Sequence, residues 1–527
     1  GFATLKVAGL AAGTKLTLRY SEVLDKDGSV LNAYCQAGCA SPPFLDDMAG
    51  NAANQTDVYI ARGDGEELYT PSFTYHGFRY VGIEGLPDSF TPTGEMLTAV
   101  WVRTEVPANG HVHFPGEKVA VLNSIQTAVV YTQGSNLFSI PTDCPQREKR
   151  GWMGDAQWTS REASLNFQAG SFYENFARSF ADTQAVGCSK VGKEMGGPRP
   201  ATYECCSLKN PTFGCNWDGV ADNFTDVEGS VPDVVPYSRK TYGGWPGDPT
   251  WGIAAVEIPY QSWKVSGDKA ALAEAYGGAK AFVDFLSRHA DPPGGLVRFG
   301  YYGDWLSLNA TATPAVSSFS QILAVQRLAE MALELGFVDD ARRYKLLTMA
   351  LKKAWHERYF DPADGRYAGG SQTGLAMALY LDIPPTAELT EAVAAALAKD
   401  LFQHGPTFGG VGSRVVFEAL ARSGQMKAAV ELATRREYPS FAYMLAEGPG
   451  TLWETWDARD TLRTSLNHPM FGGGIGAFLY ELAGLSPAHQ HGAPALRISA
   501  EAAELLGAAE GAIGVPGGQL QWSWRWR

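Results

Sequence analysis

The hydrophobic period of the chain changes near Pro115, and this change constrains the fold more than any other feature. Before it, apolar and polar residues alternate in short runs, as in Leu16, Leu18 and Tyr20, and turns such as Gly63-Asp64-Gly65 separate the runs. Such alternation is typical of antiparallel strands with one buried face. We therefore expect residues 1–115 to form an antiparallel β-sandwich.

After Pro115, apolar residues recur at helical spacing, and this pattern continues to about residue 485. Loops rich in Gly, Pro and Asn, such as 291–304, 363–371 and 403–413, separate the helical stretches. Successive helical hairpins bury all their apolar stripes when they close into a ring. We expect residues 116–485 to form such an α/α barrel, with the chemistry carried by loops at one end.

The last segment, residues 486–527, differs from both. It is rich in Ala, Gly and Pro and ends in an alternation of Trp522, Trp524 and Trp526. This pattern predicts a short, incomplete C-terminal β segment.

Charge and composition narrow the class of partner. The 527-residue chain has a net charge of −13 and scattered basic residues, which argues against nucleic acid or an anionic membrane as a partner. We also expect no membrane-spanning helix, because no apolar run approaches the roughly 18 residues that one needs. The chain has 14 Trp and 22 Tyr, which suit packing against sugar rings, although an aromatic-rich core would use them equally well.

The cysteines and sequons bear on the compartment. Cys35 and Cys39 lie close together in the sequence, as do Cys188, Cys205, Cys206 and Cys215, so disulfides or free thiols are both open, and the spacing argues against zinc. Sequons at Asn54, Asn223 and Asn309 agree with secretion. The chain begins at Gly1 without a signal pattern, as expected if a signal was removed or the chain is a fragment. We expect a secreted or extracytoplasmic protein that needs no metal and no organic cofactor.

Two segments carry candidate chemistry. Residues 143–155 concentrate charged side chains around one tryptophan just before a helical pattern, and far downstream Glu454 lies between Trp453 and Trp456. Glycoside hydrolysis needs one protonated carboxyl and one carboxylate, which can come from distant parts of a chain. A solvated salt-bridge network explains the first segment equally well from its residues alone.

Longer motifs favour the catalytic interpretation. Asp143-Cys-Pro-Gln-Arg-Glu148, followed by Gly151-Trp-Met-Gly-Asp-Ala-Gln157, closely resembles the catalytic-acid motif of the bacterial-type α-L-rhamnosidases, glycoside hydrolase family 78. Further blocks resemble that family in the same order, over about residues 55 to 485: Phe73-Thr-Tyr-His-Gly-Phe-Arg-Tyr80, Val231-Pro-Asp-Val-Val-Pro236, Gly247-Asp-Pro-Thr-Trp251, Tyr302-Gly-Asp-Trp305, Thr451-Leu-Trp-Glu-Thr-Trp456 and Leu466-Asn-His468.

The resemblance implies a β-sandwich followed by an (α/α)6 barrel, and release of terminal L-rhamnose from a rhamnose-containing glycoside or polysaccharide with inversion. It also implies that Glu148 is the general acid and Glu454 the base that activates water. Residues that match positions lining the sugar site are Asp143, Arg147, Trp152 and Asp155, with Trp251, Trp305 and His468 as further wall positions; Trp453, beside the base, is another candidate for substrate contact. Glu148 should then titrate above a free Glu, while Glu454 stays ionised.

Two other functions remain open from the sequence. Another (α/α)6 glycosidase, acting on unsaturated uronides or α-glucosides, shares the ring and the paired acids. A non-catalytic rhamnose-binding protein would keep the aromatic residues without the chemistry. The aglycone, the linkage and the oligomeric state are not specified by any of these motifs.

Overall fold

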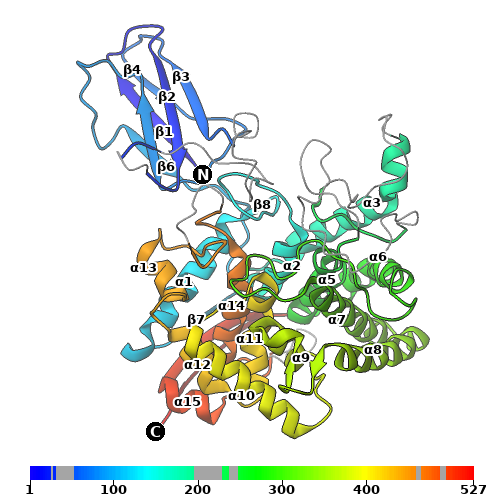
Figure 1. Ribbon diagram of the computed structural model, residues 1–527. Helices are drawn as coiled ribbons and strands as arrows, with labels where there is room; N and C mark the ends of the chain where they lie inside the picture. The colour runs from blue at the N-terminus through cyan, green and yellow to red at the C-terminus, as the bar shows by residue number, and fades with distance from the viewer. Residues whose placement is uncertain (25–27, 31–52, 195–227, 237–246, 458–463, 487–493) are drawn as a thin grey trace.

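The computed structural model describes residues 1–24, 28–30, 53–194, 228–236, 247–457, 464–486 and 494–527 (Figure 1). Cys35, Cys39, Cys205, Cys206, Cys215 and the sequon at Asn223 lie outside these residues, as does the side chain of Cys188, so the disulfide prediction is not addressed. No helix of the described part of the chain combines the length and the apolar character needed to cross a membrane.

The N-terminal domain consists of two three-stranded antiparallel sheets, in the orders β4–β1–β6 and β3–β2–β5. Its strands are β1 (Phe2–Ala8), β2 (Lys15–Ser21), β3 (Thr56–Ile60), β4 (Glu66–Tyr69), β5 (Tyr80–Glu84) and β6 (Leu97–Val100). Alternate residues of β1 and β2, among them Leu5, Leu16 and Leu18, are buried in one apolar cluster shared by both sheets. The alternating pattern of the sequence therefore correctly predicted a sheet domain.

The helical domain follows. Its helices are α1 (Ala120–Ser135), α2 (Met153–Asn166), α3 (Gly170–Glu194), α4 (Pro249–Gly252), α5 (Ala254–Ser266), α6 (Lys269–Arg288), α7 (Thr313–Glu334), α8 (Val338–Tyr359), α9 (Gln372–Tyr380), α10 (Ala387–His404), α11 (Gly410–Arg422), α12 (Met426–Thr434), α13 (Phe441–Glu447) and α14 (Gly472–Leu482). Short strand pairs, β8 (Leu137–Phe138) with β9 (Ile140–Pro141) and β10 (Phe360–Asp361) with β11 (Arg366–Tyr367), lie in the connections.

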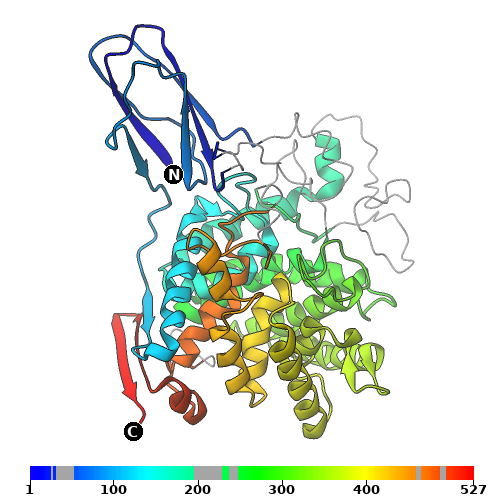
Figure 2. The same cartoon turned by 60° about the vertical axis from the view of Figure 1, so that its left-hand side comes forward.

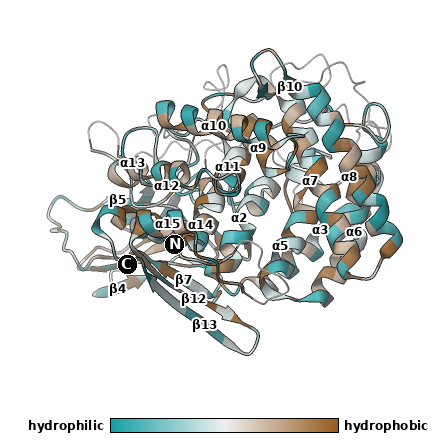
Figure 3. Ribbon diagram, turned by 90° about the horizontal axis from the view of Figure 1, so that it is seen from below, coloured by the Kyte–Doolittle hydropathy of each residue, from teal (hydrophilic) through white to brown (hydrophobic). Residues whose placement is uncertain are grey.

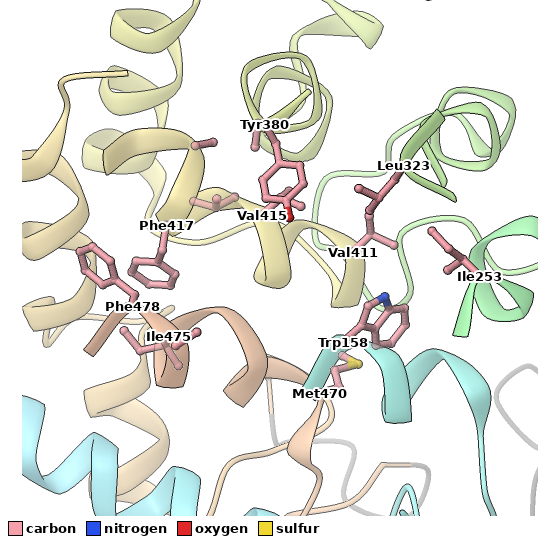
Figure 4. Close-up of a cluster of buried hydrophobic side chains, with 14 of the residues drawn as sticks. Trp158, Ile253, Leu323, Tyr380, Val411, Val415, Phe417, Met470, Ile475 and Phe478 are labelled. Atoms are coloured by element: carbon pink, nitrogen blue, oxygen red, sulfur yellow. The ribbon is translucent and has the colours of Figure 1, made fainter. Parts of the chain in front are cut away.

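Largely buried helices alternate along the chain with helices that bury one face. The buried helices contact one another in the order α2, α5, α7, α9, α11 and α14, and α14 contacts α2 again. Helices α6, α8, α10 and α12 lie outside them (Figure 3). Figure 4 shows the interior between these helices, where Trp158 of α2 lies near Met470 and Val411. The helical period after Pro115 thus correctly predicted a helical domain.

The C-terminal segment packs on the helical domain, at the end away from the N-terminal sheets (Figure 2). It comprises α15 (Ala500–Leu506), β12 (Ala508–Val515) and β13 (Gly518–Arg525). Of the alternating tryptophans, Trp522 and Trp524 lie in β13, while Trp526 directly follows it. The indoles of Trp522 and Trp524 both donate to the carbonyl of Ala483, at 2.7 and 2.8 Å. The third strand of this sheet is β7 (Gly110–His113), which the sequence had grouped with the N-terminal domain.

Buried aspartates fix the loops at the end of the helical domain that faces the N-terminal sheets. Asp248 caps α4 by accepting from the amides of Thr250 and Trp251, and it also accepts from the amide of Tyr301 at 2.7 Å. Asp304 accepts from three amides at the start of α11, those of Gly409, Val411 and Gly412. These carboxylates tie separate loops together and so hold the segments from which the candidate site is built.

Candidate active site

Arg147 lies between the two glutamates that the sequence proposed as acid and base. Its Nη1 is 3.0 Å from Oε1 of Glu148, and its Nη2 donates to Oε2 of Glu454 at 2.6 Å. The two side chains keep 8% and 5% exposure, so both are desolvated but neither is sealed from solvent. Two carboxylates that are about three hundred residues apart in sequence therefore meet at one guanidinium.

The loop that carries Glu148 is closed by Asp143. The carboxylate of Asp143 accepts from the amide of Arg150 at 2.9 Å, and the two backbones are joined by a further hydrogen bond. Lys149, at the tip of this loop, has a φ of 55°, and its ammonium donates a hydrogen bond to the carbonyl of Tyr75 in the N-terminal domain. The indole of Trp152, at the start of α2, donates to Oε2 of Glu148. Both carboxyl oxygens of Glu148 are therefore held, Oε1 by Arg147 and Oε2 by Trp152.

The two glutamates titrate in opposite directions. Burial raises the pKa of Glu148, and the negative charge of Glu454 adds to the increase, although Arg147 opposes it. Burial alone would also raise the pKa of Glu454. The charge of Arg147, together with the hydrogen bonds from Arg147 and the Ser465 amide, holds that pKa below its usual value. One protonated and one ionised carboxyl is the pairing that glycoside hydrolysis requires.

Asp155 and His468 form a second buried pair beside the glutamates. Nε2 of His468 lies 3.3 Å from Oδ1 of Asp155, and both side chains are almost fully buried. Burial lowers the pKa of His468 to about 4 and raises that of Asp155, which also feels the charges of Asp143 and Glu454. Since Nδ1 of His468 accepts from the amide of Met470, its proton lies on Nε2, facing Asp155.

Aromatic rings line the segments on one side of this cluster. The ring of Tyr302 lies 4.1 Å from that of Trp251, 5.9 Å from that of Trp152 and 6.0 Å from that of Trp305. Trp152 and Trp305 are half-buried, whereas Trp251 is 2% exposed and packs against Gly154 at the start of α2. The indoles of Trp152 and Trp305 keep some exposed surface, and substrate contact by Trp152, Trp251 and Trp305 stays a prediction.

Trp453 lies apart from this group. It is 1% exposed and packs against Tyr443 and Gly448, on the α13 side of the segment that carries Glu454. Trp456 is likewise buried among Phe408, Phe441 and Phe471. The flanking tryptophans therefore anchor the segment in the core, and substrate contact by Trp453 stays a prediction.

Three residues of the cluster were not singled out in the sequence. Tyr302 donates to the carboxylate of Asp233, and both belong to motifs whose resemblance to the family was noted without a role for either residue. Glu22, directly after β2, accepts from the amide of Leu466 at 2.9 Å, and no motif of the sequence pointed to it.

No cluster of potential metal ligands occurs within the described ranges. A separate small cavity of about 20 Å³ lies between α2, α11 and α14, lined in part by Arg161, Glu418 and Glu481. It includes none of the predicted site residues, so it does not belong to the glutamate pair.

The raised pKa of Asp143 predicts a pH-dependent cost to folding. Burial and the charge of Glu148 raise this pKa from 3.8 to about 8. Between these values the folded state binds more protons than the unfolded state, so the contribution of Asp143 to stability falls as pH rises through this window. Asp143→Asn removes the titration and keeps an acceptor for the Arg150 amide. We expect the free energy of unfolding of this variant, relative to that of the unsubstituted chain, to rise by at least about 1 kcal/mol from pH 5 to pH 8. Thermal unfolding at each pH measures this difference. A difference that stays constant or falls would contradict this assignment.

A buried pair of carboxyls with opposite pKa shifts beside half-buried indoles, on loops of a helical domain, is the arrangement of a glycoside hydrolase. Residues 118–483 match the family described as the bacterial alpha-L-rhamnosidase 6 hairpin glycosidase domain, and residues 1–103 match the bacterial alpha-L-rhamnosidase concanavalin-like domain. The chain belongs to the bacterial α-L-rhamnosidase family, as its motifs predicted.

Individual relatives agree with this assignment. The structure of an α-L-rhamnosidase from Dictyoglumus thermophilum is similar at a TM-score of 0.80 and 29% identity, covering 100% of this chain and 53% of that one. The α-L-rhamnosidase of Streptomyces avermitilis, solved in complex with L-rhamnose, gives a TM-score of 0.80 at 26% identity and covers 100% and 45% of the two chains. A curated α-L-rhamnosidase from Streptomyces avermitilis is 28% identical over 92% of this chain and 42% of its own. The chain thus spans about half the length of these relatives.

Proposed function

We propose that this chain hydrolyses α-L-rhamnosides, releasing terminal L-rhamnose by a single displacement with inversion. The observation that carries the proposal is the contact of Arg147 with both Glu148 and Glu454, whose pKa values shift in opposite directions. We further infer that the two N-terminal sheets form a β-sandwich and that the paired helices form an (α/α)6 barrel, because the buried helices contact one another in a closed order.

In the proposed reaction, Glu148 donates its proton to the glycosidic oxygen as the bond to the anomeric carbon breaks. Glu454 accepts a proton from a water that attacks the opposite face of the sugar, so the oxygen of the new hydroxyl comes from that water. Charge moves from Glu454 to Glu148, while Arg147 contacts both. The total charge around the guanidinium is therefore unchanged during the step, which reduces the reorganisation that the step requires.

The surrounding residues suit a 6-deoxy sugar. Asp155 Oδ1 and Nε2 of His468, which face each other at 3.3 Å, offer an acceptor and a donor for sugar hydroxyls. The half-buried rings of Trp152 and Trp305 offer apolar surface for the C–H face and the methyl group. A rhamnose-containing glycoside or polysaccharide is the proposed substrate. An extracytoplasmic location is part of the proposal and rests on the exposed sequons at Asn54 and Asn309.

A panel of aryl glycosides tests the substrate class. The chain is expected to release p-nitrophenol from p-nitrophenyl α-L-rhamnopyranoside and to leave the α-glucoside and an unsaturated uronide intact. Turnover of either of those two without turnover of the rhamnoside would replace the proposed substrate. Calorimetric binding of L-rhamnose without turnover of any substrate would instead identify a sugar-binding protein.

A further inference from the structure

Glu22 belongs to the N-terminal domain in sequence but to the candidate active site in space. It directly follows β2, and its Oε2 accepts from the amide of Leu466 at 2.9 Å, across 444 residues. The preceding amide, that of Ser465, donates to Oε2 of Glu454, also at 2.9 Å. Two consecutive amides of one short segment are therefore held by two carboxyl groups, one of which is the proposed base.

Glu22 is buried beside the charged groups of the candidate site. The side chain is 5% exposed, and two charged groups of the site act on it: Arg147 lowers its pKa and Glu454 raises it. Burial is the largest cause that raises the pKa of Glu22 to about 7. Below neutral pH its carboxyl is therefore mostly protonated, and Glu22 does not compete with Glu148 and Glu454 for the positive charge of Arg147. The hydroxyl of Ser465 also donates to Gln146 at 2.9 Å, in the loop that carries the acid.

The two domains are joined at other points as well. Tyr75 stacks on Phe138 at 4.1 Å, and Lys149 donates to the carbonyl of Tyr75. Gly77 packs so closely on Pro145 and Gln146 that a Cβ would clash with them. Because these contacts hold the domains together without Glu22, its hydrogen bond to Leu466 is not required for docking.

We propose that Glu22 is a positioning residue for the base: by holding the amide of Leu466, it fixes the adjacent amide that orients the carboxylate of Glu454. The inference rests on the proposed function and deepens it, since the N-terminal domain then supplies part of the catalytic geometry. Small displacements of a reacting group lower the rate far more than they weaken binding.

Three variants of the full chain test this role: Glu22→Ala, Glu22→Gln and the control Glu67→Ala. Glu67 is a buried glutamate of the same domain that accepts from the amides of Arg62 and Gly63. We expect Glu22→Ala to lower kcat for p-nitrophenyl α-L-rhamnopyranoside about tenfold or more with KM within about twofold. The low-pH limb of kcat/KM should move to higher pH, because Glu454 loses the donor that lowers its pKa. Glu22→Gln keeps an acceptor and should recover most of kcat near pH 6, and Glu67→Ala should match the unsubstituted chain in kcat.

Hydrogen–deuterium exchange gives a readout that does not need turnover. The amides of Ser465 and Leu466 should exchange at least about tenfold faster in Glu22→Ala than in Glu67→Ala. If the unsubstituted chain hydrolyses no rhamnoside, the proposed function fails, and exchange still decides whether Glu22 holds this segment. Unchanged kcat and unchanged exchange in Glu22→Ala would overturn the inference, as would a loss of kcat that Glu22→Gln fails to recover.

Discussion

Glu148→Gln should lower kcat by about 10³-fold on a rhamnoside whose leaving group is a sugar or an alcohol, because such groups must be protonated as they depart. The loss should be much smaller on p-nitrophenyl α-L-rhamnopyranoside, since nitrophenolate leaves readily without a proton. Steady-state kcat on both substrates measures the difference. The alkaline limb of the pH profile, which reports the raised pKa of Glu148, should disappear in the variant.

Glu162→Gln is the matched control for this substitution. Glu162 lies on α2, close to Glu148 in sequence, and is fully buried. Burial raises its pKa, so the amide of the variant replaces a carboxyl that is already neutral. It should retain kcat within about twofold on both substrates. Equal losses on the two substrates in Glu148→Gln, or similar losses in Glu162→Gln, would remove the role of Glu148 as acid.

Glu454→Gln should lower kcat by about 10³-fold on both substrates alike, because activation of the attacking water does not depend on the leaving group. The ratio of the losses on the two substrates therefore separates the base from the acid. Added azide should restore part of the turnover of Glu454→Ala by attacking without a general base, and the rhamnosyl azide formed should have inverted configuration.

The fold of these base variants needs a direct check, because Glu454 pairs with the buried Arg147 and loss of one partner of such a pair is destabilising. Circular dichroism at the assay temperature, and a thermal melt that shows a Tm above that temperature, provide this check. A folded Glu454→Gln that retains full activity would exclude Glu454 as the base. A rhamnosyl azide of retained configuration would exclude a single displacement.

The sequence predicted the order of the domains because each period is a local property. Alternation in β1 and β2, and helical spacing after Pro115, each reflect burial of one face of a single element. The partner of β7 was not predictable in this way. β7 pairs with β12, about four hundred residues later, and nothing in either segment specifies the other.

The site was predictable as far as its motifs reached. The segment 143–155 identified the loop of Glu148, and the resemblance identified Glu454, but the contact of Arg147 with both glutamates depends on tertiary structure. Glu454 was expected to stay ionised, but the cause was not visible in the sequence: burial alone would raise its pKa, and the charge of Arg147 lowers it. Glu22 escaped notice because an isolated glutamate after a strand is usually a solvated residue.

The most direct test follows the product anomer by proton NMR during hydrolysis of p-nitrophenyl α-L-rhamnopyranoside, with enough enzyme to finish before mutarotation. Attack by water on the face opposite the leaving group predicts that β-L-rhamnose appears first and that the α anomer follows at the rate of mutarotation. If α-L-rhamnose is the first product, or if no rhamnose is released, Glu148 and Glu454 do not act as this inverting pair.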